Sequence, residues 1–172
     1  MNSRGRQCDH RHSGYTLVEL LLIVSIMGLA AAIVVPHMIR SGQLTIQAAG
    51  RAIIADILYA QNEAVANQEP RKVTFDVAGN RYRVTDAEDK TIGVSWKSGG
   101  SATQNYVVDF NRESRFAGVK LASVNFAGGT TLEFDDLGAP VNGGTIDLVF
   151  EDTRYRISVA PFTGRVTIDR VQ

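Results

Sequence analysis

Apolar residues follow three different patterns along this chain. From Leu20 to Val35 nearly every position is apolar, whereas between about 37 and 68 apolar residues recur every three or four positions. After Pro70 the apolar residues alternate with polar ones. These periods predict an uninterrupted apolar helix, an amphipathic helix and a series of β-strands, in that order. The chain is therefore expected to have an α+β fold.

The amphipathic stretch has one clear apolar stripe, and polar residues such as Arg51 and Gln61 fall largely on other faces. This stripe predicts a helix lying against a globular domain. Pro36 removes one helical hydrogen bond and its ring crowds the preceding turn, so we expect a kink there; a simple end of the apolar helix is the alternative. The stripe consists of Ile46, Ala49, Ile53, Ile57, Ala60 and Ala64.

The segment after the helix is rich in short alternating runs. Val73, Phe75 and Val77 alternate with polar residues before a turn at 78–80, and Gly-rich turns separate the later runs. About eight short strands without a second helix predict an antiparallel, β-sandwich-like domain that the amphipathic helix caps.

Three arginines, Arg4, Arg6 and Arg11, precede the apolar run, which is long enough to cross a bilayer as a helix. This arrangement predicts a cytoplasmic N-terminus and a translocated C-terminal part. Residues 30–32 are all alanine and resemble a signal peptidase site. However, residues 33–35 continue the apolar run, where such a site would have a short polar region.

Glu19 interrupts the start of the apolar segment. An acid near the start of a membrane helix costs about 2–3 kcal/mol unless it is neutralised, paired or near the headgroups. Glu19 is therefore a functional candidate, and a carboxylate that reaches the membrane interface is the alternative.

The stretch Gly14-Tyr15-Thr16-Leu17-Val18-Glu19-Leu20 resembles the prepilin peptidase motif of type IV pilins and pseudopilins. In that motif a glycine ends the leader, and glutamate is the fifth mature residue; Tyr15 stands where phenylalanine is usual. The resemblance implies cleavage between Gly14 and Tyr15, N-methylation of Tyr15, and pairing of Glu19 with the terminal amine of a neighbouring subunit during assembly.

The same resemblance implies four regions and a location in the bacterial inner membrane. They are a basic leader at 1–14, a transmembrane and polymerisation helix at 15–36, its amphipathic continuation at 37–68 and a periplasmic β domain at 69–172. The fold implied is pilin-like and single-pass. The implied partners are prepilin peptidase, other pilins or pseudopilins, membrane lipid and an inner-membrane assembly platform.

The C-terminal part is similar to the GspH/FimT family of minor pseudopilins and minor pilins. The resemblance implies a structural subunit of a type II secretion pseudopilus, or alternatively a minor type IV pilin acting in assembly, adhesion or DNA uptake. The residues that carry this resemblance are the stretches 134–138, 146–150, 155–159 and 163–166.

Composition excludes several functions. Eighteen basic and eighteen acidic residues give no net charge, so nothing global attracts nucleic acid. The sequence has no P-loop, zinc spacing or nucleophile elbow, and we expect no enzyme activity, metal or cofactor. The single cysteine, Cys8, has no partner for a disulfide. With His10 and His12 it lacks a fourth metal ligand and a rigid frame.

Two further binding sites were considered in the β domain. Asp109, Asn111 and Glu113 alternate in a way that could converge on calcium, but they match no complete loop pattern, and a solvated loop is favoured. Gly164-Arg165-Val166-Thr167 lacks the second arginine of a DNA-uptake motif. Acidic residues also interrupt the possible basic stripe, so DNA is not an expected partner. That stripe would contain Arg154, Arg156, Arg165 and Arg170.

Overall fold

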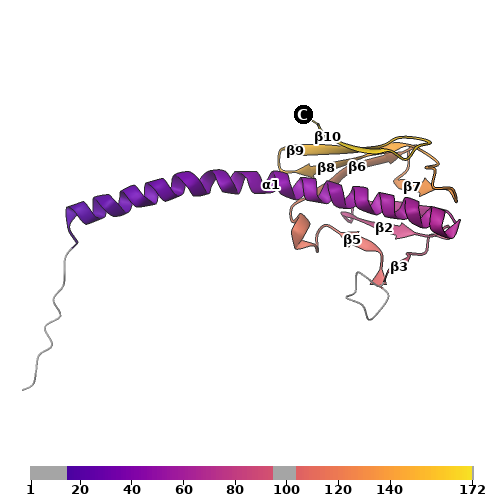
Figure 1. Ribbon diagram of the computed structural model, residues 1–172, viewed down its shortest axis with the longest axis horizontal. Coiled ribbons are helices and arrows are strands. Elements are labelled where there is room, and N and C mark those ends of the chain that lie inside the picture. The colour runs from indigo at the N-terminus through magenta and orange to yellow at the C-terminus, as the bar shows by residue number, and fades with distance from the viewer. Residues whose placement is uncertain (1–14, 95–103, 172) are drawn as a thin grey trace, which may run out of the picture. The chain divides into compact units, whose positions relative to one another are not determined.

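The computed structural model of the chain describes residues 15–94 and 104–171, with the side chains of 33–43 and of 104 left out (Figure 1). The chain divides into two compact units, residues 1–40 and 41–172, each described here by itself. Several predicted features lie outside the described residues: Gly14, the leader arginines, Cys8, His10, His12 and the side chain of Pro36.

One long helix, α1, runs from Leu17 to Asn67. Its backbone is helical at position 36, so the helix does not end at Pro36, and the kink stays a prediction. The helix ends in a Schellman motif: Gln68 has φ of 52°, its N–H donates to the Val65 carbonyl, and the Glu69 N–H donates to the Ala64 carbonyl. Pro70 follows and prevents continuation.

The strands form two four-stranded antiparallel sheets and one small hairpin, which confirms the predicted α+β, sandwich-like fold. The first sheet has the order β5-β2-β1-β7, and the second has the order β10-β9-β8-β6. The first contains β1 (Arg71–Asp76), β2 (Arg81–Thr85), β5 (Val107–Asp109) and β7 (Thr131–Phe134). The second contains β6 (Lys120–Phe126), β8 (Gly144–Phe150), β9 (Thr153–Val159) and β10 (Val166–Val171).

A small hairpin and a 3-10 helix complete the described elements. The hairpin pairs β3 (Gly93–Val94) with β4 (Gln104–Asn105), and a 3-10 helix, η2, spans Ser114–Phe116. The described residues thus contain ten strands rather than about eight. Strand β4 has only two residues, too few for alternation to be recognised in the sequence.

The core lies between α1 and the inner faces of both sheets. The predicted stripe from Ile46 to Ala64 is fully buried at all six positions. On the sheets, Phe75 of β1 and Phe126 of β6 stack with ring centroids 6.1 Å apart, which joins one sheet to the other. Among the described residues, every buried hydrophobic side chain lies at or after Ile46. The unit 41–172 therefore contains the whole of this core.

Polar contacts fix the helix on the sheets. The hydroxyls of Tyr82 and Tyr106 each donate to the Asp56 carboxylate at 2.6 Å. Gln61 Nε2 donates to the Gly138 carbonyl at 2.7 Å. Gly138 has φ of 78°, and a Cβ there would lie 2.5 Å from Val65, so glycine permits this close approach. These contacts set the register of α1 along the domain.

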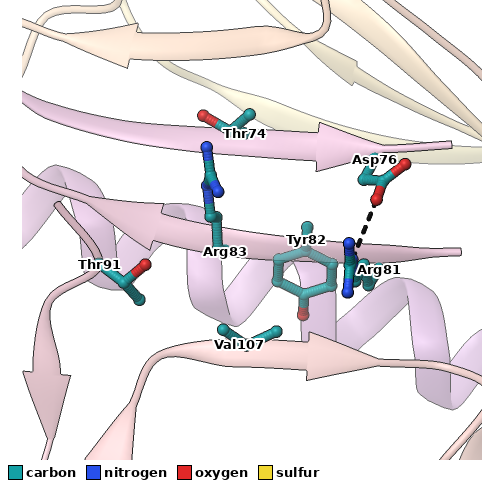
Figure 2. Close-up of a pocket in the computed structure, with 7 residues that line it drawn as sticks. All are labelled: Thr74, Asp76, Arg81, Tyr82, Arg83, Thr91 and Val107. Carbon is teal, nitrogen blue, oxygen red and sulfur yellow. Dashed lines mark hydrogen bonds and ion pairs between the residues drawn. The ribbon is translucent and has the colours of Figure 1, made fainter. Parts of the chain in front are cut away.

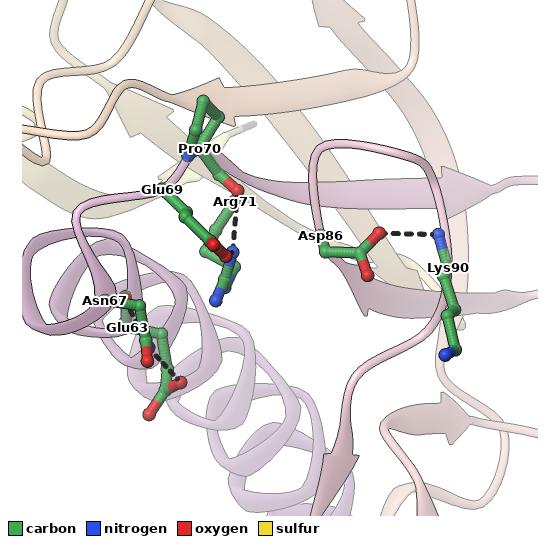
Figure 3. A network of polar contacts seen from close by, with 7 residues as sticks. All are labelled: Glu63, Asn67, Glu69, Pro70, Arg71, Asp86 and Lys90. Carbon is green, nitrogen blue, oxygen red and sulfur yellow. Dashed lines mark hydrogen bonds and ion pairs between the residues drawn. The ribbon is translucent and has the colours of Figure 1, made fainter.

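A second polar group lies where α1 leads into β1 (Figure 3). The nearly buried Arg71 side chain donates to the Glu69 carboxylate at 3.1 Å and to the Pro70 carbonyl at 3.0 Å. Asn67 donates to the backbone and side chain of Glu63 one turn earlier. The connection between helix and sheet is therefore held by short local contacts.

Candidate functional site at the start of α1

The predicted cleavage position lies next to the first turn of α1. Tyr15 and Thr16 precede the helix, and Tyr15 is 74% exposed. Thr16 Oγ1 accepts a hydrogen bond from the Glu19 N–H at 3.2 Å, and the Thr16 carbonyl accepts one from the Leu20 N–H at 3.2 Å. Thr16 is thus the N-cap, which satisfies one of the donors left free at a helix start.

Glu19 occupies the third position of the helix, counted from this cap. The spacing Thr16-x-x-Glu19 is that of a capping box. A carboxylate in the first turn also interacts favourably with the positive end of the helix dipole. The fifth residue after the predicted cleavage therefore combines two properties: its backbone is fixed by the cap, and its side chain is exposed to solvent.

The apolar segment that follows is exposed along its described length. All described side chains from Tyr15 to Ala32 are exposed, including Leu17 at 75% and Leu29 at 69%. Large apolar surfaces exposed in this way mark sites of interaction with protein or membrane. Among the residues that the structure describes, no helix meets the length and hydropathy needed to cross a membrane.

The amphipathic half of α1 has an exposed stripe opposite the buried one. Its members are spaced alternately by four and three residues, the period that favours packing against another helix. Five of its seven positions are apolar. This outer stripe, as we call it, consists of Leu44, Ala48, Arg51, Ala55, Leu58, Asn62 and Val65.

The calcium candidates do not converge. Asp109 accepts from the Asn111 N–H at 2.9 Å and lies 3.5 Å from Arg112, while Glu113 pairs with Arg115. The described residues contain no group of three potential metal ligands.

The four arginines of the possible basic stripe also do not form one surface. Arg156 lies opposite Asp169 in the register of β9 and β10, whereas Arg170 lies opposite Tyr155 and so on the other face of the sheet. Arg156 is paired with Asp147 through two hydrogen bonds of 2.7 and 2.8 Å. Two of the four arginines are therefore lost to a basic stripe. Arg156 is paired with an acid, and Arg170 lies on the other face of the sheet.

Two important groups were missed by the sequence analysis. The Thr16 cap could have been found, because Thr-x-x-Glu before an apolar run is a recognised helix start. The bidentate pair of Asp147 and Arg156, to which Ser123 also donates at 3.1 Å, joins three strands of the second sheet. Its pairing depends on register, which no local pattern in the sequence encodes.

Comparison with known proteins agrees with this geometry. Residues 9–35 match the prokaryotic N-terminal methylation motif. The chain carries this motif on a pilin-like fold. It is 27% identical over 154 residues to type II secretion system protein H of Xanthomonas campestris, a match that covers 89% of this chain and 80% of the relative.

Two solved structures have a similar fold. The minor pseudopilin EpsH from the type 2 secretion system of Vibrio cholerae superimposes with a TM-score of 0.51 at 12% identity, over 72% of this chain and 95% of EpsH. The type IV minor pilin FimU of Pseudomonas aeruginosa gives 0.51 at 18% identity, over 76% of this chain and 93% of FimU. These findings confirm the predicted resemblance to GspH-like minor pseudopilins and the pilin-like fold.

Proposed function

We propose that this chain is a minor pseudopilin, a structural subunit of a type II secretion pseudopilus that prepilin peptidase processes. The observation that carries the proposal is the start of α1. A capped first turn places Glu19 at the start of a largely apolar, exposed helical segment. The methylation motif at 9–35 and the similarity to a secretion-system protein H support the same function. A catalytic role is not proposed.

Processing would cut between Gly14 and Tyr15 and leave a cationic, methylated amine on Tyr15. This amine would pair with Glu19 of a neighbouring subunit. A buried ion pair gives little net stability, but an unpaired buried charge costs several kcal/mol. Glu19 would therefore act mainly on register, because a subunit docked one step away would leave its carboxylate without a partner.

Before assembly, the segment 15–36 would anchor the chain in the inner membrane, with a cytoplasmic N-terminus and the domain 69–172 in the periplasm. During assembly it would leave the lipid and pack among the helices of other pseudopilins. The outer stripe supports this model of assembly, since its period suits packing against another helix. The assembly platform of the inner membrane and the prepilin peptidase would be the other partners.

A second candidate function is that of a minor type IV pilin. The fold similarity to FimU favours it as much as the similarity to EpsH favours the pseudopilus. Deletion of the gene in its own host separates the two. Loss of secreted proteins from the medium with normal surface pili supports the pseudopilus, and the reverse result supports the pilus.

The processing step is tested by the mass of the purified chain. The protein from its host should begin with a methylated Tyr15, and replacement of Gly14 by a bulky residue such as arginine should leave the leader in place. A small residue is expected there because a peptidase at the membrane surface must approach the backbone closely. Normal cleavage of Gly14→Arg, or a chain beginning at Ile33, would contradict the proposal.

The assembly step is tested with Glu19→Ala. This variant should be cleaved as wild type and yet be depleted from sheared filament fractions. Glu88→Ala is the matched control, since Glu88 is an exposed acid of the β domain. Incorporation of Glu19→Ala at the wild-type level would remove the pairing role without affecting the assignment of the cleavage site.

A further inference from the structure

The first sheet has a hollow on the face directed away from α1. Its volume is about 390 Å³, and it is lined mainly by polar side chains of β1 and β2 (Figure 2). The Arg83 side chain extends across it toward Thr74, and Thr91 and Val107 lie at its sides. The neighbouring Tyr82 points to the opposite face, where it binds Asp56.

Strand register explains why Arg83 lies in the middle of this hollow. Arg83 is opposite Thr74 on one side and Val107 on the other, so its row across the sheet contains no acid on these strands. In the next row Arg81 is opposite both Asp76 and Asp109. Arg83 is therefore the arginine of β2 that has no carboxylate directly across from it.

The other cations of this face are already paired. Arg81 lies 3.0 Å from the Asp76 carboxylate, and Lys72 lies 3.0 Å from Asp89. Asp76 also accepts from the Gly79 N–H at 2.8 Å, and this bond, followed by the bond from Arg81, lowers the Asp76 pKa. Among the described residues, Arg83 has no hydrogen bond or ion pair of its own.

Apart from Asp76, whose carboxylate pairs with Arg81 and whose pKa Arg83 also helps to lower, the groups around Arg83 suit a carboxylate. A guanidinium group presents parallel N–H donors that match the two oxygens of a carboxylate. The hydroxyls of Thr74 and Thr91 line the same hollow, and Val107 offers an apolar wall for a methylene stem. Thr85, joined to Thr91 by an isolated bridge, has a buried hydroxyl without a partner among the described residues.

The hollow is lined by more polar than apolar residues and is open to solvent. Sites for small molecules are mostly apolar and enclose most of the ligand. An open hollow on a sheet face, with an arginine across it, instead suits a single side chain that projects from another protein. We propose that the Arg83 hollow binds the carboxylate of an acidic side chain of a partner protein. This proposal does not depend on whether the chain serves a pseudopilus or a pilus.

The test follows the Nε–H resonance of Arg83 in the full chain in detergent, with arginine labelled by ¹⁵N. The probe is the peptide N-acetyl-Gly-Glu-Gly-amide, and its glutamine counterpart is the neutral control. Saturable shifts of Arg83 and of the Thr74 and Thr91 amides are expected with the glutamate peptide alone. Equal shifts with both peptides, or no saturation, would overturn the proposal.

Variants identify the side chain responsible. Arg83→Gln should abolish the saturable shifts, and Arg83→Lys should weaken binding, because an ammonium group lacks the planar fork. Arg154→Gln, which removes an exposed arginine from the other sheet, should leave binding unchanged. Unaltered binding by Arg83→Gln contradicts the assignment. Tighter binding of inorganic phosphate than of the glutamate peptide contradicts the carboxylate specificity.

Discussion

The hydroxyl of Tyr82 on β2 lies 2.6 Å from Oδ2 of Asp56 on α1, and this contact joins the helix to the first sheet. Tyr106 donates to the other oxygen of the same carboxylate. Burial, followed by the nearby Asp56 charge, raises the Tyr82 pKa well above its usual value. The Asp56 carboxylate and the two tyrosine hydroxyls thus form one hydrogen-bonded unit.

We expect Asp56→Ala to lower the free energy of unfolding by about 2–3 kcal/mol, because two tyrosine hydroxyls lose a charged acceptor. Urea unfolding measures this change, with Arg51→Ala, an exposed position of the same helix, as the control.

The raised Tyr82 pKa also predicts a pH dependence of the free energy of unfolding. The neutral Tyr82 hydroxyl stabilises the fold fully below about pH 10, the pKa of tyrosine in the unfolded chain. This stabilisation is lost as the pH rises through the higher pKa of the folded state. Tyr82→Phe should reduce this alkaline loss.

A second prediction separates folding from assembly. Ile57 is fully buried and Leu58 is 43% exposed, although they are neighbours in α1. Ile57→Ala should cost about 2–5 kcal/mol through lost burial and the cavity left behind. Leu58→Ala should cost less than about 1 kcal/mol, since it changes a largely exposed position. If the outer stripe takes part in assembly, Leu58→Ala should nevertheless reduce incorporation into filaments.

The pair of Asp147 and Arg156 predicts sensitivity to acid. The hydrogen bond from Arg156, which outweighs the opposing effect of burial, lowers the Asp147 pKa. A lowered pKa stabilises the fold above the unfolded value of about 4, and this stabilisation is lost as pH falls through the folded value. Asp147→Asn should therefore lower the urea midpoint at pH 7 and make it less dependent on pH between 5 and 2. An unchanged acid profile would contradict this.

The last prediction concerns the cap at the start of α1. Thr16→Val keeps the shape of the side chain but removes the oxygen that accepts the Glu19 N–H. The loss of a cap costs about 1 kcal/mol, which corresponds to about fivefold faster hydrogen exchange of the Glu19 amide. Thr16→Ser should exchange as wild type. Equal exchange rates in all three proteins would show that Thr16 does not cap the helix.

Hydrophobic periodicity predicted the elements that have one buried face and one exposed face. The stripe from Ile46 to Ala64 is buried at each predicted position, because a helix bordering a single core has an unambiguous inner face. The alternation in β8 and β9 likewise places Ile146 and Ile157 inside. Glu19 stands out in the sequence because it is an acid within an apolar run, and its role stays a prediction.

The remaining groups depend on register between distant segments. Asp56 lies outside the buried stripe of α1, yet it binds tyrosines 26 and 50 positions away. Arg154 and Arg170 looked like members of one basic stripe, but the pairing of β9 and β10 directs them to opposite faces. The sequence specifies such contacts only through the complete fold, so local patterns could not predict them.

The described core of the 41–172 unit begins at Ile46, after the entire apolar stretch. Among the described side chains, those of the segment proposed to exchange lipid for neighbouring helices thus contribute none to the core of the folded domain. A subunit that passes from bilayer to fibre would change the solvent of one segment and keep its tertiary structure. The free energy of extraction from the membrane and the free energy of folding therefore depend on different residues, and separate mutations can change each one.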